Sequence, residues 1–336
     1  MDSPNQSRSR PELKAFLKAA QPWLIRLVGV LLLIYLLAMV DLKALLTIWA
    51  SARKSYLLAA VILAYLMMLF KVERWRVLLK AQKIYFSFKD ANVAYLSAYY
   101  AGVVTPGRAG EFLKLIHLRQ KAGTNLGAGI VSVLLDRLLD LIVLVVLASL
   151  GVVLIPQFAV LGGLETWTAG IALLSIVAIT FLRSKPCQRW VTRLVSAMLT
   201  RFGTSQVHEQ LKDFRRGLQK AGKPGVMAPV LALTLASWTA LLLACFALIL
   251  SLGINVSFWY VAFAMAAAGL VSLLPFSIAG IGVRDTALVA IFGLVGISES
   301  ASLAYSLLYF AVFGLLLGLT GAYFWHKYPV ASWRDG

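Results

Sequence analysis

Long runs of apolar residues alternate with short polar and basic segments along the whole chain. A membrane-spanning helix needs about 20 mostly apolar residues, and six runs either reach that length or approach it with their flanking residues. They cover residues 23–40, 56–70, 126–155, 168–182, 227–252 and 302–325. The pattern predicts an all-α integral membrane protein with about six full transmembrane helices.

Two further apolar segments, 91–121 and 258–297, are each interrupted by Pro and Gly, with an Arg and a carboxylate beside the interruption. The interruptions read Tyr100-Ala-Gly-Val-Val-Thr-Pro-Gly-Arg-Ala-Gly-Glu111 and Leu274-Pro-Phe-Ser-Ile-Ala-Gly-Ile-Gly-Val-Arg-Asp285. The residues that suit a sharp turn are Pro106, Gly110, Pro275, Gly280 and Gly282. Irregular backbone at membrane depth must be buried in protein or line a wet cavity. Both segments are therefore candidate broken-helix hairpins, and simple kinked helices are the alternative.

The distribution of basic residues decides how these segments run. The N-terminal segment, the 71–90 loop and the 183–226 loop are rich in Lys and Arg, so all three are expected in the cytoplasm. If 91–121 crossed the membrane fully, the basic 183–226 loop would lie outside. We therefore predict that 91–121 enters from the cytoplasm and returns there. The same reasoning predicts that 258–297 is re-entrant from the opposite side.

Each predicted hairpin precedes a long apolar run, which is the arrangement expected of an inverted repeat, although residue identity between the halves is slight. We expect a cytoplasmic N-terminal segment at 1–22, a single transmembrane domain at 23–326 and a short cytoplasmic tail at 327–336. Residues 188–202 place apolar side chains on one helical face and most arginines off it. They predict an amphipathic helix, either at the membrane interface or packed on the bundle.

The composition agrees with a membrane protein, since 60% of residues are hydrophobic and 14% are charged. Soluble domains are about 45–50% apolar and about 25% charged. The net charge of +18 is explained by cytoplasmic basic segments and contact with anionic lipid, so no nucleic-acid partner is expected. No metal-ligand spacing, nucleotide-binding loop or catalytic triad is present in the sequence. We therefore expect no metal, no cofactor and no enzymatic activity.

Seven charged residues lie within or beside the apolar sequence: Arg108, Glu111, Asp136, Arg137, Asp140, Arg284 and Asp285. Each would cost about 2.5–3.5 kcal/mol in lipid, or about 20 kcal/mol together, so they must face one another or water. Arg108 and Glu111 share a face if a helix restarts at the turn. Arg284 and Asp285 are neighbours and are expected to reach different partners. We assign Arg74, on the basic 71–90 loop, to a cytosolic cap.

Two interpretations of these charges stay open. One is a structural network of ion pairs. The other is a polar cavity in the membrane, in which the planar fork of Arg would bind a lipid phosphate through two parallel hydrogen bonds.

Three motifs give the chain a resemblance to a known family. They are Thr105-Pro-Gly-Arg-Ala-Gly-Glu111, Asp136-Arg-Leu-Leu-Asp140 and Ser277-Ile-Ala-Gly-Ile-Gly-Val-Arg-Asp285. In this order they resemble the transmembrane region of lysylphosphatidylglycerol synthases, the flippase-like domain family. That family usually has Glu at position 136 and often at 285, where this chain has Asp. The resemblance covers about residues 20–325 and implies an all-helical protein that moves lipids across the bilayer. The chain ends at Gly336, so we expect no appended transferase domain.

The expected function is a flippase for an anionic phospholipid or a polyprenyl-phosphate-type lipid in the plasma (inner) membrane, with both termini in the cytoplasm. Anionic membrane lipids are the expected partners, and a separate soluble transferase is a further candidate. The candidate head-group residues are Arg108, Arg137, Arg284, Thr105 and Gly107, with Glu111, Asp136, Asp140 and Asp285 as charge or proton partners. The alternative is a membrane subunit or enzyme of lipid head-group or lipid-linked sugar modification.

Overall fold

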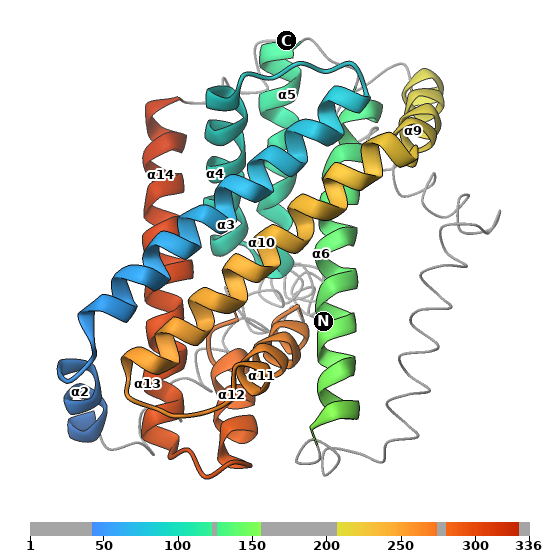
Figure 1. Ribbon diagram of the computed structural model, residues 1–336. Helices are drawn as coiled ribbons and strands as arrows, with labels where there is room; N and C mark the ends of the chain where they lie inside the picture. The colour runs from blue at the N-terminus through green and yellow to red at the C-terminus, as the bar shows by residue number, and fades with distance from the viewer. Residues whose placement is uncertain (1–41, 123–125, 156–206, 274–279, 329–336) are drawn as a thin grey trace, which may run out of the picture.

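The computed structural model describes residues 42–122, 126–155, 207–273 and 280–328, and these parts form helices joined by short turns (Figure 1). The elements are α2 Leu42–Ala50, α3 Lys54–Ala81, α4 Phe88–Val104, η1 Pro106–Leu113, α5 Lys114–Ala122, α6 Leu126–Leu154, α9 Val207–Ala221, α10 Pro224–Ser251, α11 Phe258–Val271, α12 Val283–Gly293, α13 Glu299–Tyr309, η3 Phe310–Leu316 and α14 Leu317–Lys327. The predicted all-α class is confirmed.

Four helical stretches in the described residues are long and apolar enough to span a membrane. They are Lys54–Ala81, Gly129–Leu154, Pro224–Ser251 and Glu299–Lys327. The last of these joins α13, the π-helical segment η3 and α14 into one helix. The predicted spans 23–40 and 168–182, the predicted amphipathic helix 188–202 and the turn residue Pro275 lie outside the described residues.

The predicted loop at 71–90 is wrong over its first half. Helix α3 continues through residue 81, because residues 54–81 contain neither Gly nor Pro to interrupt it. The helix ends where Lys83 adopts a left-handed conformation with φ 64°. The charged residues at 71–76 therefore extend an apolar helix instead of lying on a flexible loop.

The first predicted hairpin consists of α4, the 3₁₀ segment η1 and α5. Helix α4 starts at the end of the molecule where α3 ends, and α5 returns to that same end (Figure 1). The turn forms where Pro106 follows Thr105, because a proline ring disfavours helical continuation through the residue before it. As predicted, residues 91–121 enter the bundle and leave it at one end.

The second hairpin consists of α11 and α12 and has the opposite orientation. It starts after α10 and leads into α13 at the end of the molecule where α3 begins (Figure 1). Two glycines with positive φ, Gly280 at 77° and Gly282 at 80°, shape the backbone that precedes α12. This conformation is readily available to Gly and strained for other residues.

The two halves of the protein repeat at a constant spacing. Helices α3 and α10 are both 28 residues long and begin at Lys54 and Pro224, 170 positions apart (224 − 54). At the same spacing, Ile84-Tyr-Phe-Ser-Phe88 corresponds to Ile254-Asn-Val-Ser-Phe258. In each linker the Ser hydroxyl accepts a hydrogen bond from a backbone N–H in the first turn of the next helix.

Packing follows the same two-fold pattern. Helix α3 lies along α10, whereas the first helix of each hairpin packs on the long helix of the other half: α4 on α14, and α11 on α6. The hairpin of each half thus packs on a helix of the other half, near the centre of the bundle. This arrangement is an inverted repeat in which both hairpins reach the interior of the bundle.

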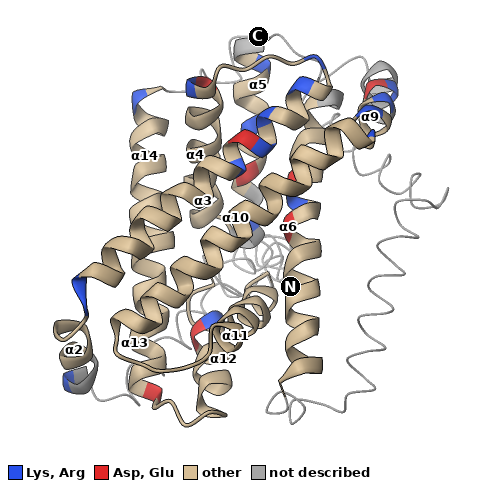
Figure 2. Ribbon diagram, in the orientation of Figure 1, with Lys and Arg blue, Asp and Glu red and all other residues tan. Residues whose placement is uncertain are grey.

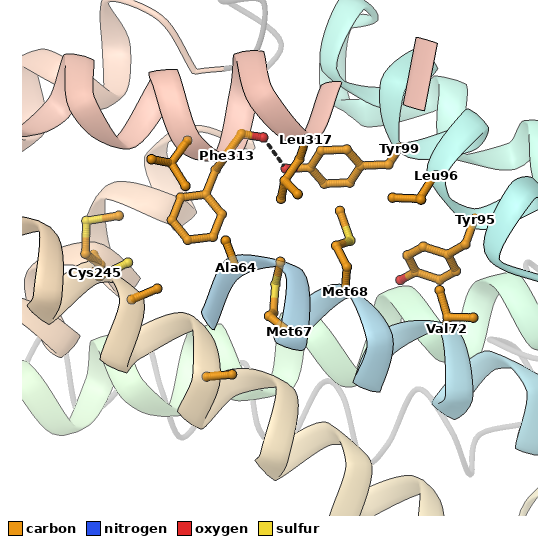
Figure 3. Close-up of a cluster of buried hydrophobic side chains, with 14 of the residues drawn as sticks. Ala64, Met67, Met68, Val72, Tyr95, Leu96, Tyr99, Cys245, Phe313 and Leu317 are labelled. Atoms are coloured by element: carbon orange, nitrogen blue, oxygen red, sulfur yellow. Dashed lines mark hydrogen bonds between the residues drawn. The ribbon is translucent and has the colours of Figure 1, made fainter. Parts of the chain in front are cut away.

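The apolar core near this centre joins helices from both halves. Figure 3 shows Met67 and Met68 of α3, Tyr95 and Tyr99 of α4 and Phe313 of η3 in one apolar cluster. The Tyr99 hydroxyl donates a 2.6 Å hydrogen bond to the Phe313 carbonyl. This buried contact ties the first hairpin to the last helix.

Candidate functional site

Asp136 is the centre of a buried polar network between α3, α4, α5 and α6. Its Oδ1 accepts hydrogen bonds from Arg74 Nη2 at 2.6 Å and from Nε at 2.9 Å. Its Oδ2 accepts from Lys114 Nζ at 2.9 Å and from the Tyr95 hydroxyl at 3.0 Å. All four side chains are buried. Because both carboxylate oxygens are fully engaged, Asp136 fixes the positions of these helices.

Asp140 lies one turn further along α6 and is held in a similar way. Lys71 Nζ lies 2.6 Å from its Oδ2, and Arg74 Nη1 lies 2.8 Å from its Oδ1. The indole N–H of Trp238 in α10 donates to Oδ1 at 3.3 Å. Arg74 therefore bridges the two aspartates, which lie on one face of α6 as the sequence predicted.

The assignment of Arg74 to a cytosolic cap is wrong, since its side chain is fully buried and bonded to both aspartates. Lys71 and Arg74 are three residues apart, so they share a helical face. That face continues the apolar run of α3 without a break. The three sequence motifs contain four carboxylates but only three arginines. This imbalance was a further signal that the candidate site lacked a cation.

Glu111 connects the first hairpin to α6. Arg137 Nη1 donates to Glu111 Oε1 at 2.6 Å, and Arg137 Nη2 also contacts Oε2. Lys114 Nζ lies 3.7 Å from Glu111 Oε2. Arg137 thus acts as the partner of Glu111 across the turn, and its guanidinium also borders the cavity described below.

Arg108 differs from the other cations because its side chain is 46% exposed, against 2% for Glu111. Its Nη1 lies 3.7 Å from Glu111 Oε1, and its guanidinium lies 5.7 Å from the centre of the Tyr99 ring. The 3₁₀ turn places Arg108 and Glu111 on one face, as their spacing predicted. The backbone of Arg108 has φ 56°, an uncommon conformation that stores strain outside Gly.

Arg284 in the first turn of α12 is the arginine that the second hairpin contributes to the site. Its Nη2 donates to Asp285 Oδ1 at 2.8 Å and its Nε donates to Ser306 Oγ at 3.1 Å. The expectation that Arg284 and Asp285 reach different partners is wrong, because both also meet Ser306. Asp285 Oδ2 in addition accepts from the Gly282 N–H at 2.8 Å, which caps the helix. The guanidinium lies 4.9 Å from the centre of the Tyr309 ring.

The spacing of 170 relates these contacts in the two halves. Lys114 corresponds to Arg284 (284 − 114) and Asp136 corresponds to Ser306 (306 − 136). Lys114 bonds Asp136 and Arg284 bonds Ser306, so the contact itself is repeated. The second half has a hydroxyl where the first has a carboxylate, and the adjacent Asp285 supplies the missing negative charge.

The first turn is closed by close backbone contacts. The Thr105 hydroxyl donates to the Ala101 carbonyl and accepts from the Gly110 N–H, both at 2.7 Å. A Cβ on Gly110 would lie 2.3 Å from the Ala101 carbonyl carbon, so only Gly fits there. Thr105 thus satisfies backbone groups freed by the break, and Gly107 lies in the turn between these contacts.

A cavity of about 320 Å³ lies between the two halves and receives side chains from both hairpins. Its charged lining consists of Lys71, Arg108, Arg137, Asp140 and Arg284. Figure 2 shows charges on α3, on α6 and at the start of α12, inside a bundle that is otherwise mainly uncharged at this depth. A cavity lined by four cations and one carboxylate suits an anionic group.

No group of three or more His, Cys, Asp or Glu residues that could hold a metal ion occurs in the described parts of the chain. The carboxylates of the site each contact Lys or Arg.

The model of the lysylphosphatidylglycerol synthase TM region matches residues 23–321. The chain belongs to this family. The chain is also 24% identical, over 224 residues, to a UPF0104 membrane protein of Methanocaldococcus jannaschii. This match covers 65% of the chain and 90% of that relative. The family and the apolar helices make it a multi-pass membrane protein with a role related to membrane lipids.

Proposed function

We propose that this protein is a flippase that moves an anionic phospholipid or a polyprenyl-phosphate-type lipid across the plasma membrane. The observation that carries the proposal is that Arg108 and Arg284, from hairpins of opposite orientation, line the same cavity. A guanidinium fork is the side chain best matched to a phosphate. The two arginines therefore supply one head-group site that both halves of an inverted repeat can reach.

The inverted repeat supports a transport mechanism. In transporters of this kind, the substrate site lies at the interface of the repeats, and access alternates as one repeat rocks against the other. The anchored network of Asp136 and Asp140 gives the site a rigid wall on α3 and α6. Arg108 and Arg284 lie on the turns that would move relative to that wall.

The aliphatic part of a lipid also has a path out of the cavity. Leu141 of α6 and Leu273, just after α11, line the cavity, and their exposed fractions are 39% and 45%. A head-group bound to the arginines would leave its chains against this apolar wall. The lipid would thus keep its chains in hydrocarbon while its phosphate crosses through protein.

The basic residues support an orientation with the α3–α4 linker in the cytoplasm. Lys and Arg gather where α3 ends and α5 and α9 lie (Figure 2), and cytoplasmic loops carry an excess of these residues. The carboxylates of the site are all engaged by cations, which supports a transport role over one in which a free carboxylate acts as a general base.

The test is lipid exchange between leaflets in vesicles that contain the purified protein and fluorescent phosphatidylglycerol or polyprenyl phosphate. Wild-type protein is expected to exchange at least one of them, and Arg108→Ala and Arg284→Ala are each expected to lose most of that activity. Arg216→Ala is the matched control, because Arg216 lies on α9 with its side chain 59% exposed. Failure of the wild type to exchange either lipid would refute the proposal. Full activity in both cavity variants would refute the site.

A further inference from the structure

The charges around the cavity do not balance within the described parts of the chain. Six cations belong to the network or the cavity lining: Lys71, Arg74, Arg108, Lys114, Arg137 and Arg284. They meet four carboxylates: Glu111, Asp136, Asp140 and Asp285. The difference is two positive charges (6 − 4).

The surplus is located in the first half of the protein. Arg284 and Asp285 neutralise one another at 2.8 Å. The remaining five cations share only three carboxylates, and Arg108 shares Glu111 with the closer Arg137. Both excess charges therefore lie on the side of the cavity formed by α3, η1 and α6, where Lys71, Arg108 and Arg137 reach the lining.

We propose that the head-group carried by this protein is a terminal phosphate monoester with two negative charges. This inference rests on the proposed lipid transport and narrows its substrate class. Unpaired charge is unfavourable away from water, so a dianion is the ligand that brings the site to neutrality. A phosphodiester lipid leaves one positive charge over, and a head-group with net positive charge adds to the surplus.

The positions of the arginines agree with a monoester. A terminal phosphate presents three strong acceptor oxygens and carries about −1.5 to −2 charges at pH 7. A diester has only two non-bridging oxygens. Arg108 and Arg284 come from opposite hairpins and Lys71 and Arg137 line the same cavity, so a phosphate there meets donors from more than two side chains, which suits three acceptor oxygens better than two. The same chemistry occurs in phosphatidate and in polyprenyl monophosphate.

The experiment compares labelled phosphatidate, polyprenyl monophosphate, phosphatidylglycerol and phosphatidylcholine in vesicles containing wild-type protein, at pH 8 and at pH 5.5. At pH 8, at least one monoester is expected to exchange roughly tenfold faster than phosphatidylglycerol, because its second charge meets a surplus cation at low dielectric. The second pKa of a phosphate monoester is about 6. The preference should therefore shrink several-fold at pH 5.5, where the monoester carries close to one charge.

Arg108→Gln removes one surplus charge and is expected to reduce the monoester preference at pH 8 severalfold, whereas Arg216→Gln on exposed α9 should retain it. The preference is a ratio of rates in one protein preparation, so partial misfolding of a variant does not change it. A preference for either monoester supports the proposal. The choice between phosphatidate and polyprenyl monophosphate identifies the kind of lipid chain that the protein accepts. Equal exchange of phosphatidylglycerol and both monoesters would overturn this inference and leave anionic lipid transport intact. Absence of exchange for every anionic lipid would overturn the proposed function itself.

Discussion

Replacing Arg74 by Met is expected to destabilise the folded protein by about 3–5 kcal/mol, the range found when one member of a buried ion pair is removed. Arg74 is fully buried. It donates to Asp136 at 2.6 and 2.9 Å and to Asp140 at 2.8 Å. Hydrogen bonds to charged groups contribute about 1.5–3 kcal/mol each, so the three bonds to carboxylates have a limit near 9 kcal/mol. Arg74 also donates to the Thr234 hydroxyl at 3.3 Å and to the Asp136 carbonyl at 3.2 Å.

The net cost is smaller than that limit for two structural reasons. Lys114 still neutralises Asp136 and Lys71 still neutralises Asp140 in the variant. Met also fills much of the volume that the Arg side chain occupied, which limits the cavity left behind. The loss of the bridge between the two aspartates remains, and it gives the expected 3–5 kcal/mol.

The measurement is thermal unfolding of the purified protein in detergent, with Arg76→Met as the matched control. Arg76 is on the same helix and also forms an ion pair, with Glu73 at 2.5 Å, but its side chain is 31% exposed. Exposed pairs contribute about 0–1 kcal/mol. At about 2 °C per kcal/mol for a chain of this size, Arg74→Met should lower the midpoint by roughly 6–10 °C and the control by about 2 °C or less.

Two results would contradict the reasoning. One is an equal loss of stability in Arg74→Met and Arg76→Met. The other concerns the double variant Arg74→Met/Asp136→Asn. If the two residues interact, its change in the free energy of unfolding differs from the sum of the two single changes. Additivity within about 0.5 kcal/mol would mean that they do not interact.

Two further predictions concern the packing of the first hairpin on the last helix. A Cβ on Gly321 would lie 2.3 Å from the Leu96 carbonyl oxygen, whereas nothing lies within 4 Å of one on Gly318. Gly321→Ala should therefore lower the free energy of unfolding by at least about 1 kcal/mol, and Gly318→Ala should be neutral or stabilising. The reverse order of stabilities would show that α14 does not pack tightly on α4 there. Tyr99→Phe removes the hydroxyl that donates to the Phe313 carbonyl and should cost about 1–3 kcal/mol in the same assay. Lipid exchange should persist in Tyr99→Phe, because the aromatic ring beside Arg108 is kept. An unchanged midpoint of thermal unfolding would argue against the hydrogen bond.

Local sequence patterns were sufficient to predict much of the fold. Apolar length predicted the helices, and the Pro and Gly residues at 105–110 marked a real turn. Loop charge predicted that 91–121 returns to its own end of the molecule, which the course of α4 and α5 confirms. The repeat was also accessible from the sequence: the matching Ile-x-x-Ser-Phe linkers at 84–88 and 254–258 are visible at constant spacing, although they are too short to stand out among apolar residues.

The prediction was weakest where a charged residue lay next to an apolar run. Treating each Lys or Arg as a sign of the cytoplasm moved residues 71–76 onto a loop and removed Arg74 from the site. Charge alone does not distinguish a solvated cation from a buried one. The distinction depends on whether a carboxylate from another helix is within reach, and helical periodicity gives no information about that.

The sequence by itself determined that this is a helical membrane protein with two broken segments and a set of charges that cannot face lipid, because these conclusions follow from local composition and spacing. Only the tertiary structure decided which charges pair. Arg74 and Asp136 are 62 residues apart and Lys71 and Asp140 are 69 apart, and such contacts depend on how helices pack. Within the described residues, that pairing makes Arg108 share Glu111 with Arg137. It also brings Arg108 to one cavity with Arg284. The physical reason is that neutralisation acts through space over a few ångströms, while the sequence records only order along the chain.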